Sequence, residues 1–217
     1  MEHERKELLK MCEGKKYSII YADPAWQYND KMKMQGVHGM IRGAESFYPT
    51  LSIAEIKSLP INEIADENCV LFIWVTMPLL QEGLDTIKAW GFQFKTCGFT
   101  WVKKTKNNKI HCGMGHYTRG NAELCLIGTK GKLKRKSASV YQIVEAEIKQ
   151  HSQKPPIIRD KIVELYGALP RIELFARNTV EGWDCWGNET EKFSSDFKEG
   201  EIFNNSFHQQ TLFGDRT

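Results

Sequence analysis

The tetrapeptide Asp23-Pro24-Ala25-Trp26 is the part of this sequence best suited to chemistry. Its carboxylate and the carbonyl of Pro24 offer two hydrogen-bond acceptors, and Trp26 offers a flat ring. The exocyclic amino group of adenine is a poor nucleophile, because its lone pair is delocalised into the ring. Two acceptors on its N–H bonds would direct that lone pair at an incoming methyl group, and stacking on the indole would add about 1–3 kcal/mol. The tetrapeptide therefore predicts methylation of such an amino group; the alternative is a turn with a packed aromatic ring.

The elements around the tetrapeptide predict an α/β fold. Tyr17–Ala22 is an apolar run typical of a buried strand, and it ends at Asp23. Ligands of open α/β sheets bind beyond the carboxyl ends of strands, which is where Asp23 would lie. The pattern predicts further strands at 69–75, 92–102, 122–128, 171–176 and 183–186, and helices at 52–59, 78–90 and 155–166. This alternation is typical of a mostly parallel sheet covered by helices.

Four further segments belong with the tetrapeptide: 113–123, 151–155, 171–177 and 182–189. In this order and spacing, they resemble the MT-A family of adenine-N6 methyltransferases, the family of the catalytic subunit of the mRNA adenosine methyltransferase. The resemblance covers residues 17–189. It implies S-adenosyl-L-methionine as cofactor and a single Rossmann-like domain with helices on both faces. The catalytic element precedes the cofactor elements, as in the permuted, β-type class of amino methyltransferases.

The resemblance also implies roles for individual residues. The catalytic set is Asp23, Pro24 and Trp26, and the cofactor-binding set is Asp23, Lys154, Arg177, Asn188 and Glu189. The substrate-binding set is Trp26, Tyr28, His116, Tyr117, Arg119, Glu123 and Lys154. Glu173 is expected to brace Arg177, either within the cofactor site or as a purely structural pair. No metal is expected, because the spacing of His111, Cys112 and His116 fits no standard zinc site.

Two departures from the family pattern leave a rival interpretation open. Ala25 stands where the family has a second proline, and Thr179 and Val180 stand where it has a His-Asn pair that contacts the ribose. The loss of the proline removes stiffness worth about 0.4–1 kcal/mol but neither acceptor. The rival is a catalytically silent nucleic-acid-binding scaffold subunit of the same fold.

The charge of the chain is unevenly distributed. Ten basic residues and one acidic residue lie between Lys103 and Lys136, so this segment carries +9 and the rest of the chain −6, within a net +3. Such asymmetry predicts a surface for nucleic-acid phosphates; solvated loop tips are the alternative. The compact chain favours DNA over RNA, in a prokaryotic or phage enzyme. A homodimer and a heterodimer with a related subunit are both open.

Length and composition predict one methyltransferase domain over 1–189, followed by a polar, poorly ordered tail over 190–217. No apolar run approaches the ~18 residues of a membrane span, and the charged start of the chain is unlike a secretory signal. The six cysteines contain no CxxC pair and suit reduced thiols. These features predict a cytoplasmic protein that does not contact membranes.

Overall fold

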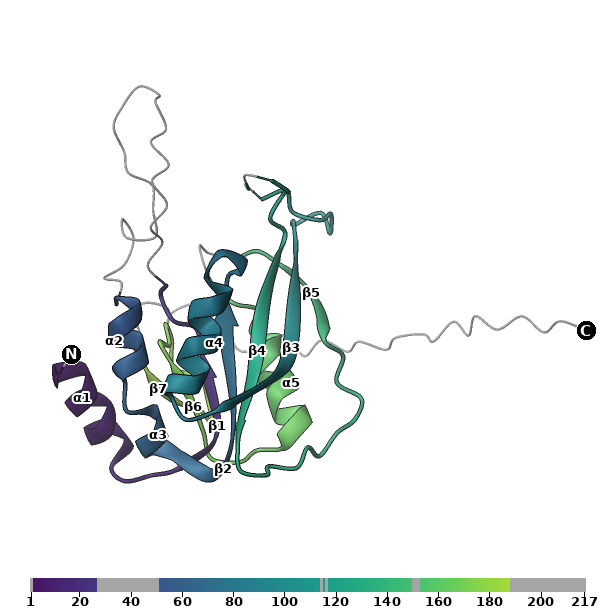
Figure 1. The fold of residues 1–217 in the computed structure, drawn as a ribbon. Coiled ribbons are helices and arrows are strands. Elements are labelled where there is room, and N and C mark those ends of the chain that lie inside the picture. The colour runs from purple at the N-terminus through teal and green to yellow at the C-terminus, as the bar shows by residue number, and fades with distance from the viewer. Residues whose placement is uncertain (1, 27–50, 114, 116, 150–152, 188–217) are drawn as a thin grey trace, which may run out of the picture.

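A computed structural model describes residues 2–26, 51–113, 115, 117–149 and 153–187, and these form one curled sheet with helices on both sides (Figure 1). The strands are β1 (Tyr17–Ala22), β2 (Ala65–Val75), β3 (Gln93–Lys104), β4 (Ala122–Lys130), β5 (Ile143–Glu147), β6 (Arg171–Leu174) and β7 (Asp184–Trp186). The helices are α1 (Glu2–Cys12), α2 (Ile53–Ser58), α3 (Ile61–Ile64), the 3₁₀ helix η2 (Met77–Leu79), α4 (Leu80–Ala89) and α5 (Ile157–Tyr166). The predicted tail over 190–217 lies outside the described residues.

The order of strands in the sheet is β5-β3-β4-β2-β1-β6-β7. β1 runs parallel to both β2 and β6, β6 is parallel to β7, and β3 is parallel to β5. The mostly parallel sheet predicted from the sequence is confirmed, with one exception that the sequence pattern did not predict. β4 is antiparallel to both of its neighbours, β2 and β3. Its first residues therefore lie at the carboxyl ends of β1 and β2, and its last residues lie at their amino ends.

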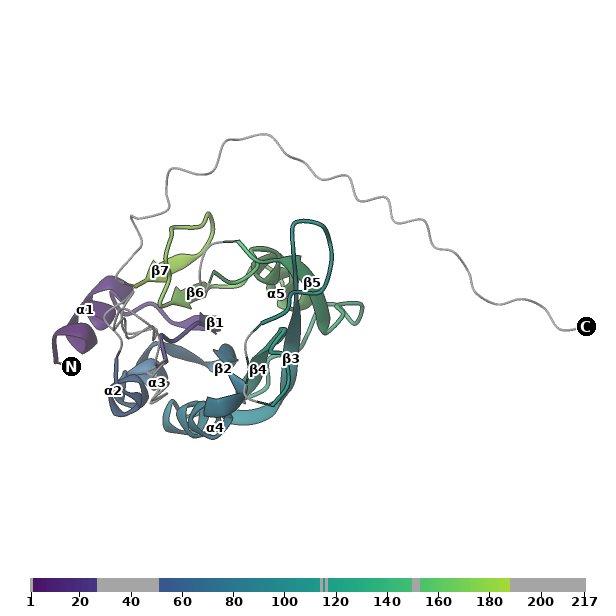
Figure 2. The ribbon, with the colours of Figure 1, turned by 90° about the horizontal axis from the view of Figure 1, so that it is seen from above.

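Helices cover both faces of the sheet, as Figure 2 shows from above. On one face α1, α2, α3 and α4 contribute the buried side chains Leu8, Ile56, Ile61 and Ile87 to a core with Ile20 and Ala22 of β1. On the other face α5 contributes Ile158 and Ile162 to a core with Ile19 and Tyr21. All six residues of β1 are buried, because successive side chains enter opposite cores. β1 is thus held rigidly from both sides, and so is the residue that follows it.

Several local predictions are confirmed and others are wrong. Ser52 caps α2 in a reciprocal capping box with Glu55, as its sequence predicts. The helix expected over 78–90 is divided into η2 and α4, with Pro78 in the first turn of η2. α1, α3 and β5 were not predicted. None of the described helices combines the length and apolar character needed to cross a membrane.

Candidate active site

Asp23 lies directly beyond the carboxyl end of β1, between the ends of β2 and β6. The pairing of Ala22 with Leu174 brings Asp23 beside Phe175, and the Asp23 amide donates to the Leu174 carbonyl at 3.4 Å. β1 connects through α2 and α3 to β2 on one side, while β6 on its other side comes from much later in the chain. Such a change of direction opens a crevice at the strand ends, where α/β proteins bind ligands. The predicted catalytic carboxylate therefore occupies the predicted position.

Lys154 is the immediate partner of Asp23. Its ammonium lies 2.8 Å from Oδ1 and 2.9 Å from Oδ2 of Asp23, across a separation of 131 residues. Both side chains are largely withdrawn from solvent, with 12% of Lys154 and 18% of Asp23 exposed. Lys154 comes from the segment just before α5, as Pro155 and Pro156 lead into the helix. The structure thus joins two charged residues that the sequence assigned to the cofactor site; Asp23 was also assigned to the reaction, and Lys154 to the substrate.

A line of alternating charges continues from this pair. Lys154 lies 3.4 Å from Oε2 of Glu123, and Oε1 of the same carboxylate lies 2.6 Å from the ammonium of Lys103. Each ammonium also lies over an indole ring, Lys154 over Trp74 at 5.5 Å and Lys103 over Trp101 at 5.2 Å. The two indoles meet edge to face at 6.5 Å. The aromatic pair therefore forms a floor on which both cations are positioned.

Lys103 and Trp74 were not predicted from the sequence to be site residues. Lys103 was counted only as part of the basic segment, and Trp74 was given no role. Lys103 follows Trp101 by two positions on β3, so both side chains share one face of the strand. That alternation was the available signal for Lys103. Trp74 gave no signal, because a tryptophan in a buried strand is most simply a core residue.

The pKa values in this cluster follow from burial and from the neighbouring charges. Burial raises the pKa of Asp23 above its ordinary value, and the ammonium of Lys154 opposes that rise. Burial lowers the pKa of Lys154, but the carboxylates of Asp23 and Glu123 outweigh it and the pKa is raised. Burial also acts to raise the pKa of Glu123, but the charges of Lys154 and Lys103 outweigh this effect and the pKa is lowered. Asp23 is thus the carboxyl group of this cluster whose proton affinity is increased.

Phe175 is the strained residue of the site. It follows β6 and has a φ of +62°, a conformation that large L side chains rarely adopt. The cause is close packing against the end of β7, where the Ala176 amide donates to the Trp186 carbonyl at 2.9 Å. A Cβ on Gly187 would lie 2.3 Å from the carbonyl oxygen of Ala176, so only glycine fits there. Strain of this kind is concentrated at ligand sites, and it occurs here next to Asp23.

Glu173 was expected to brace Arg177, but its main partner in the structure is Arg159. The carboxylate of Glu173 accepts two hydrogen bonds from Arg159, from Nε at 2.5 Å and from Nη2 at 2.8 Å. Arg159 belongs to the first turn of α5, so this pair ties the helix to β6 beneath the site. Arg177 lies close enough to lower the pKa of Asp23 by its charge. Arg159 is the partner that was not predicted from the sequence.

Trp26 is placed where it cannot stack on a base in this structure. Only 5% of the residue is exposed, and its Nε1 donates to the Trp74 carbonyl at 2.9 Å. It belongs to the core on the side of the sheet that α1 to α4 cover, so its position agrees with the alternative of a turn with a packed aromatic ring. The Pro24 carbonyl accepts the Trp26 amide at 2.8 Å, which makes an inverse γ-turn centred on Ala25. A carbonyl oxygen has a second lone pair, so Pro24 retains an acceptor.

Some of the remaining predicted residues lie within the described part of the chain, and others do not. Tyr117 and Arg119 are exposed on the connection between β3 and β4, which projects beyond the strand ends near the site (Figure 1). Tyr28, His116, Asn188 and Glu189 lie outside the described residues. Within the described ranges, no three His, Cys, Asp or Glu side chains come together as a metal site would require.

A small cavity adjoins the charged cluster. It is lined by Asp23, Gln153, Lys154, Arg159, Glu173, Phe175, Arg177 and Asn178 and measures about 20 Å³. That is room for a water molecule but not for a nucleoside. These residues therefore form one end of a ligand site. Their chemistry suits a zwitterionic ligand, because three cations and two carboxylates line the cavity beside the ring of Phe175.

Comparison with known proteins matches this geometry to a family. The profile of the MT-A70 family matches residues 17–189, which include β1 with Asp23 and every element of the site. The chain belongs to the MT-A70 family of adenine-N6 methyltransferases. The fold explains how motifs in this permuted order come together in one site. The predicted catalytic residue follows β1, and the predicted cofactor motifs follow β6 and β7, yet β1 and β6 are neighbours in the sheet.

The relatives differ in how much of their length this MT-A70 chain spans. The Type II methyltransferase M.MunI of a Mycoplasma species is 36% identical over 196 residues, which cover 84% of this chain and 82% of that protein. The N(6)-adenosine-methyltransferase catalytic subunit METTL3 of Homo sapiens is 28% identical over 179 residues, covering 80% of this chain but 28% of that protein. The MT-A70-like protein of Drosophila melanogaster is similar to the same degree, with 27% of its length covered.

Proposed function

We propose that this adenine-N6 methyltransferase uses S-adenosyl-L-methionine and acts on DNA. The observation that carries the proposal is the position of Asp23, a partly buried carboxylate with a raised pKa at the sheet crevice, next to Lys154 and Phe175. Membership of the MT-A70 family supplies the reaction. The residues described here supply the means to perform it.

The described residues fit one end of S-adenosylmethionine. Its amino-acid carboxylate requires cations, which Lys154 and Arg177 supply, and its positively charged groups require an acceptor, which Asp23 supplies. When bound, this cofactor supplies an electrophilic methyl group on a sulfonium. Asn188 and Glu189 are proposed, from the family pattern, to grip the ribose.

The chain's own part in the reaction is to prepare the amino nitrogen of adenine. Asp23 accepts a hydrogen bond from one N–H of the amino group, and the Pro24 carbonyl accepts a hydrogen bond from the other. The nitrogen lone pair then faces the methyl carbon. S-adenosylmethionine held by Lys154, Arg177 and Asp23 would supply the methyl carbon: its C–S bond would break as the N–C bond forms, and its sulfur would keep the electron pair. The nitrogen then loses one proton. Asp23 is the proposed first acceptor of that proton, since its pKa is raised.

DNA is the proposed substrate because of the fraction of each relative's length that this chain covers. The Type II methyltransferase is matched over most of its length, whereas the chain corresponds to about a quarter of each N(6)-adenosine methyltransferase. The β3–β4 connection would contact the nucleic acid, because exposed Lys106, Lys109 and Arg119 accompany Tyr117 there. The free cysteines agree with a reducing compartment such as the cytoplasm.

The test is a transfer assay with methyl-labelled S-adenosylmethionine, unmethylated genomic DNA and total RNA as parallel substrates. Digestion to nucleosides should give N6-methyldeoxyadenosine from DNA and little product from RNA, and Asp23→Asn should give neither. Product from RNA alone would contradict the choice of substrate. Cofactor binding without product from any nucleic acid would favour the catalytically silent scaffold, as Ala25 and the missing His-Asn pair would allow.

A further inference from the structure

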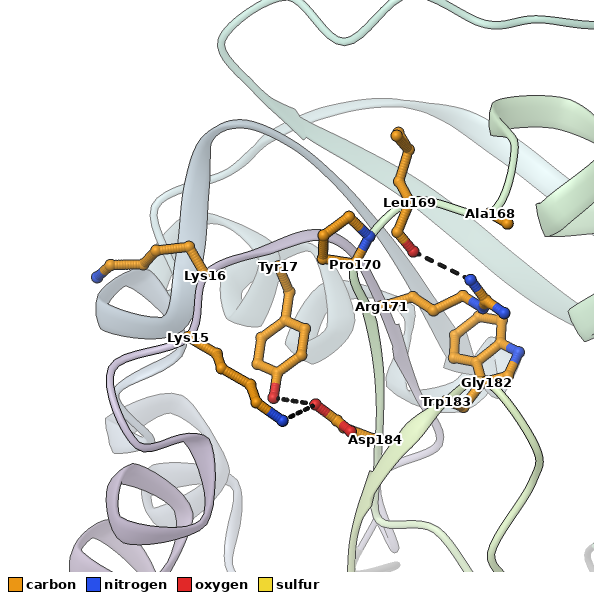
Figure 3. Close-up of a pocket in the computed structure, with 10 residues that line it drawn as sticks. All are labelled: Lys15, Lys16, Tyr17, Ala168, Leu169, Pro170, Arg171, Gly182, Trp183 and Asp184. Atoms are coloured by element: carbon orange, nitrogen blue, oxygen red, sulfur yellow. Dashed lines mark hydrogen bonds and ion pairs between the residues drawn. The ribbon is translucent and has the colours of Figure 1, made fainter.

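An open pocket of about 600 Å³ lies at the end of the sheet opposite to the active site (Figure 3). Its walls are 15–17 at the start of β1, 168–171 at the start of β6, and 182–184 at the start of β7. The proposed reaction makes no use of this end of the molecule. Lys15 enters from one side of the pocket and Arg171 from the other, while Lys16 lines the rim and its side chain points away from the pocket (Figure 3).

The guanidinium of Arg171 is held in a fixed orientation. It lies over the Trp183 ring at 5.5 Å, and its Nη1 donates to the Leu169 carbonyl at 3.1 Å. Gly182 crosses closely above it with a φ of +72°, and a Cβ there would lie 2.4 Å from Nη2. The chain has thus used a glycine to keep the guanidinium in place. A pre-oriented guanidinium loses little entropy when it binds an anion.

The acidic residue of this pocket is already compensated. Asp184 accepts hydrogen bonds from the Tyr17 hydroxyl at 2.7 Å and from Lys15 at 3.3 Å, and these bonds help to lower its pKa. Its negative charge is therefore balanced locally by Lys15. Lys16, which donates to the neutral Glu63 carbonyl, keeps its full charge, and so does Arg171. The pocket as a whole is positive.

The basic loop that follows β4 continues this positive surface. β4 is antiparallel, so its last residue pairs with Cys69 near the start of β2 and the loop emerges at the pocket's end of the sheet. The Lys136 amide donates to the Leu165 carbonyl at 2.7 Å, and the Lys136 side chain lies against Gly167, next to the pocket wall at 168. We call the combined set the basal surface: Lys15, Lys16, Lys132, Lys134, Arg135, Lys136 and Arg171.

The structure therefore divides the basic segment over 103–136 between two ends of the sheet. Lys103, Lys106 and Lys109 belong to the active-site end, while the residues after Lys130 belong to the basal surface. β4 has nine residues, so at about 3.3 Å per residue the two ends are roughly 26 Å apart. Double-stranded DNA has a persistence length of about 150 base pairs. A short duplex at the active site cannot bend round to the basal surface.

We propose that the basal surface binds the phosphodiester backbone of a second segment of nucleic acid, independently of sequence. The identity of the partner as nucleic acid rests on the proposed function. The contact is with phosphates and not with bases, because Tyr17 and Trp183 are buried and offer no ring for stacking. On long DNA the second segment is a distant part of the same molecule, so the enzyme stays bound between successive target sites.

The experiment measures how many short duplexes the full chain binds. The probe is a 14-base-pair duplex of G·C pairs only, which contains no adenine to methylate. The basal variant combines Lys16→Gln, Lys132→Gln, Lys134→Gln and Arg135→Gln. The matched control also removes four exposed charges, none of which belongs to the basal surface as defined: Lys6→Gln, Lys10→Gln, Lys88→Gln and Lys95→Gln.

Wild type and control should bind two duplexes at low salt, and the basal variant one. For the basal variant the affinity of the second duplex should fall about tenfold or more, and the slope of log K against log salt should flatten by about 0.9 for each phosphate that the variant no longer neutralises. Two duplexes on the basal variant, or one on wild type, would overturn the proposal. Loss of the second duplex to millimolar inorganic phosphate at constant ionic strength would also overturn it, in favour of a small phosphate ligand.

Methyl transfer separates this inference from the proposed function. In single turnover on plasmid DNA at saturating enzyme, the basal variant should react within about twofold of wild type, because the two sites are far apart. Absence of methylation in wild type would contradict the proposed function, but the number of duplexes bound would still test the basal surface. A basal variant that binds one duplex and still methylates gives the expected result.

Discussion

The ammonium of Lys154 donates to both carboxylate oxygens of Asp23, at 2.8 and 2.9 Å, so the group proposed to receive adenine already has a hydrogen-bond donor. For the amino group of the base to bind, Lys154 must release at least one of these oxygens. Glu123 at 3.4 Å and the Trp74 ring at 5.5 Å offer the ammonium a second set of partners. The cluster can therefore exchange partners with no loss of charge balance.

Asp23→Asn should reduce methyl transfer strongly while leaving the fold intact. The amide offers one acceptor oxygen, cannot take the departing proton, and replaces the ion pair with Lys154 by a weaker hydrogen bond. We expect the single-turnover rate to fall about a hundredfold or more. Asp85→Asn, at an exposed side chain of α4, is the matched control and should react as wild type. A loss smaller than tenfold, about 1.4 kcal/mol, would show that Asp23 does not prepare the nucleophile.

The raised pKa of Asp23 predicts a particular pH dependence. The reaction requires the ionised carboxylate, so kcat/KM should fall as the pH falls through the raised pKa. Lys154→Met removes the cation that opposes the rise, so the acid limb should move to higher pH. Lys154→Arg keeps the charge and should leave the limb near its wild-type position. An acid limb that stays in place in Lys154→Met would mean that another group controls it.

Arg159→Met tests the buried pair beneath the site. Removal of one partner leaves the Glu173 carboxylate buried without its cation, which typically costs about 3–5 kcal/mol. For a chain of this size that corresponds to a fall in Tm of about 6–20 °C. The double variant Arg159→Met, Glu173→Met should recover most of the loss, because it removes both charges.

The pH dependence of that loss has a definite sign. Burial raises the pKa of Glu173, and without Arg159 the pKa would rise further. The destabilisation of Arg159→Met should therefore be largest at neutral pH and shrink as the carboxyl becomes protonated in acid. A loss of stability that is equal at all pH values would point to lost packing of the arginine side chain instead.

Most strands and most helices could be predicted because their signals are local. β1 is an apolar run with a clear end, and the capping box that begins α2 is contained in four residues. α1 was missed because charged residues dominate its first turns, although Leu8 is fully buried. β5 was missed because it is a short strand at the edge of the sheet, with Ile143 exposed and only Val144 buried. Such elements are defined by what they pack against.

The site could be predicted only where the family pattern carried it. Lys154 and Glu123 were assigned near Asp23, but Lys103 and the tryptophan floor depend on the register between β2, β3 and β4. The same register explains why the basic segment is divided between two ends of the sheet. Trp26 was assigned to base stacking because an aromatic ring beside a carboxylate suggests it. Its burial depends on the core that α1 to α4 form with the sheet, which the tetrapeptide does not encode.

Ala25→Pro should raise turnover modestly and leave cofactor binding unchanged. Ala25 is not among the residues with a positive φ, and the central φ of an inverse γ-turn is typically about −75°, which lies within the range that proline adopts. Among the described residues the Ala25 amide donates no hydrogen bond, so its loss costs none. The proline removes unproductive conformations of the turn, worth about 0.4–1 kcal/mol, and the single-turnover rate should rise about two- to fivefold.

Ala25→Gly is the matched opposite of this substitution, because it loosens the same turn. It should lower the rate by a similar factor and leave the affinity for S-adenosylmethionine unchanged in a titration. Pro24 would precede a proline in Ala25→Pro and so be biased toward extended ψ, which suits the exit from β1. A large loss of activity in Ala25→Pro would mean that the turn must change conformation when adenine binds. In that case the alanine is a requirement of this chain and not a weakened form of the family motif.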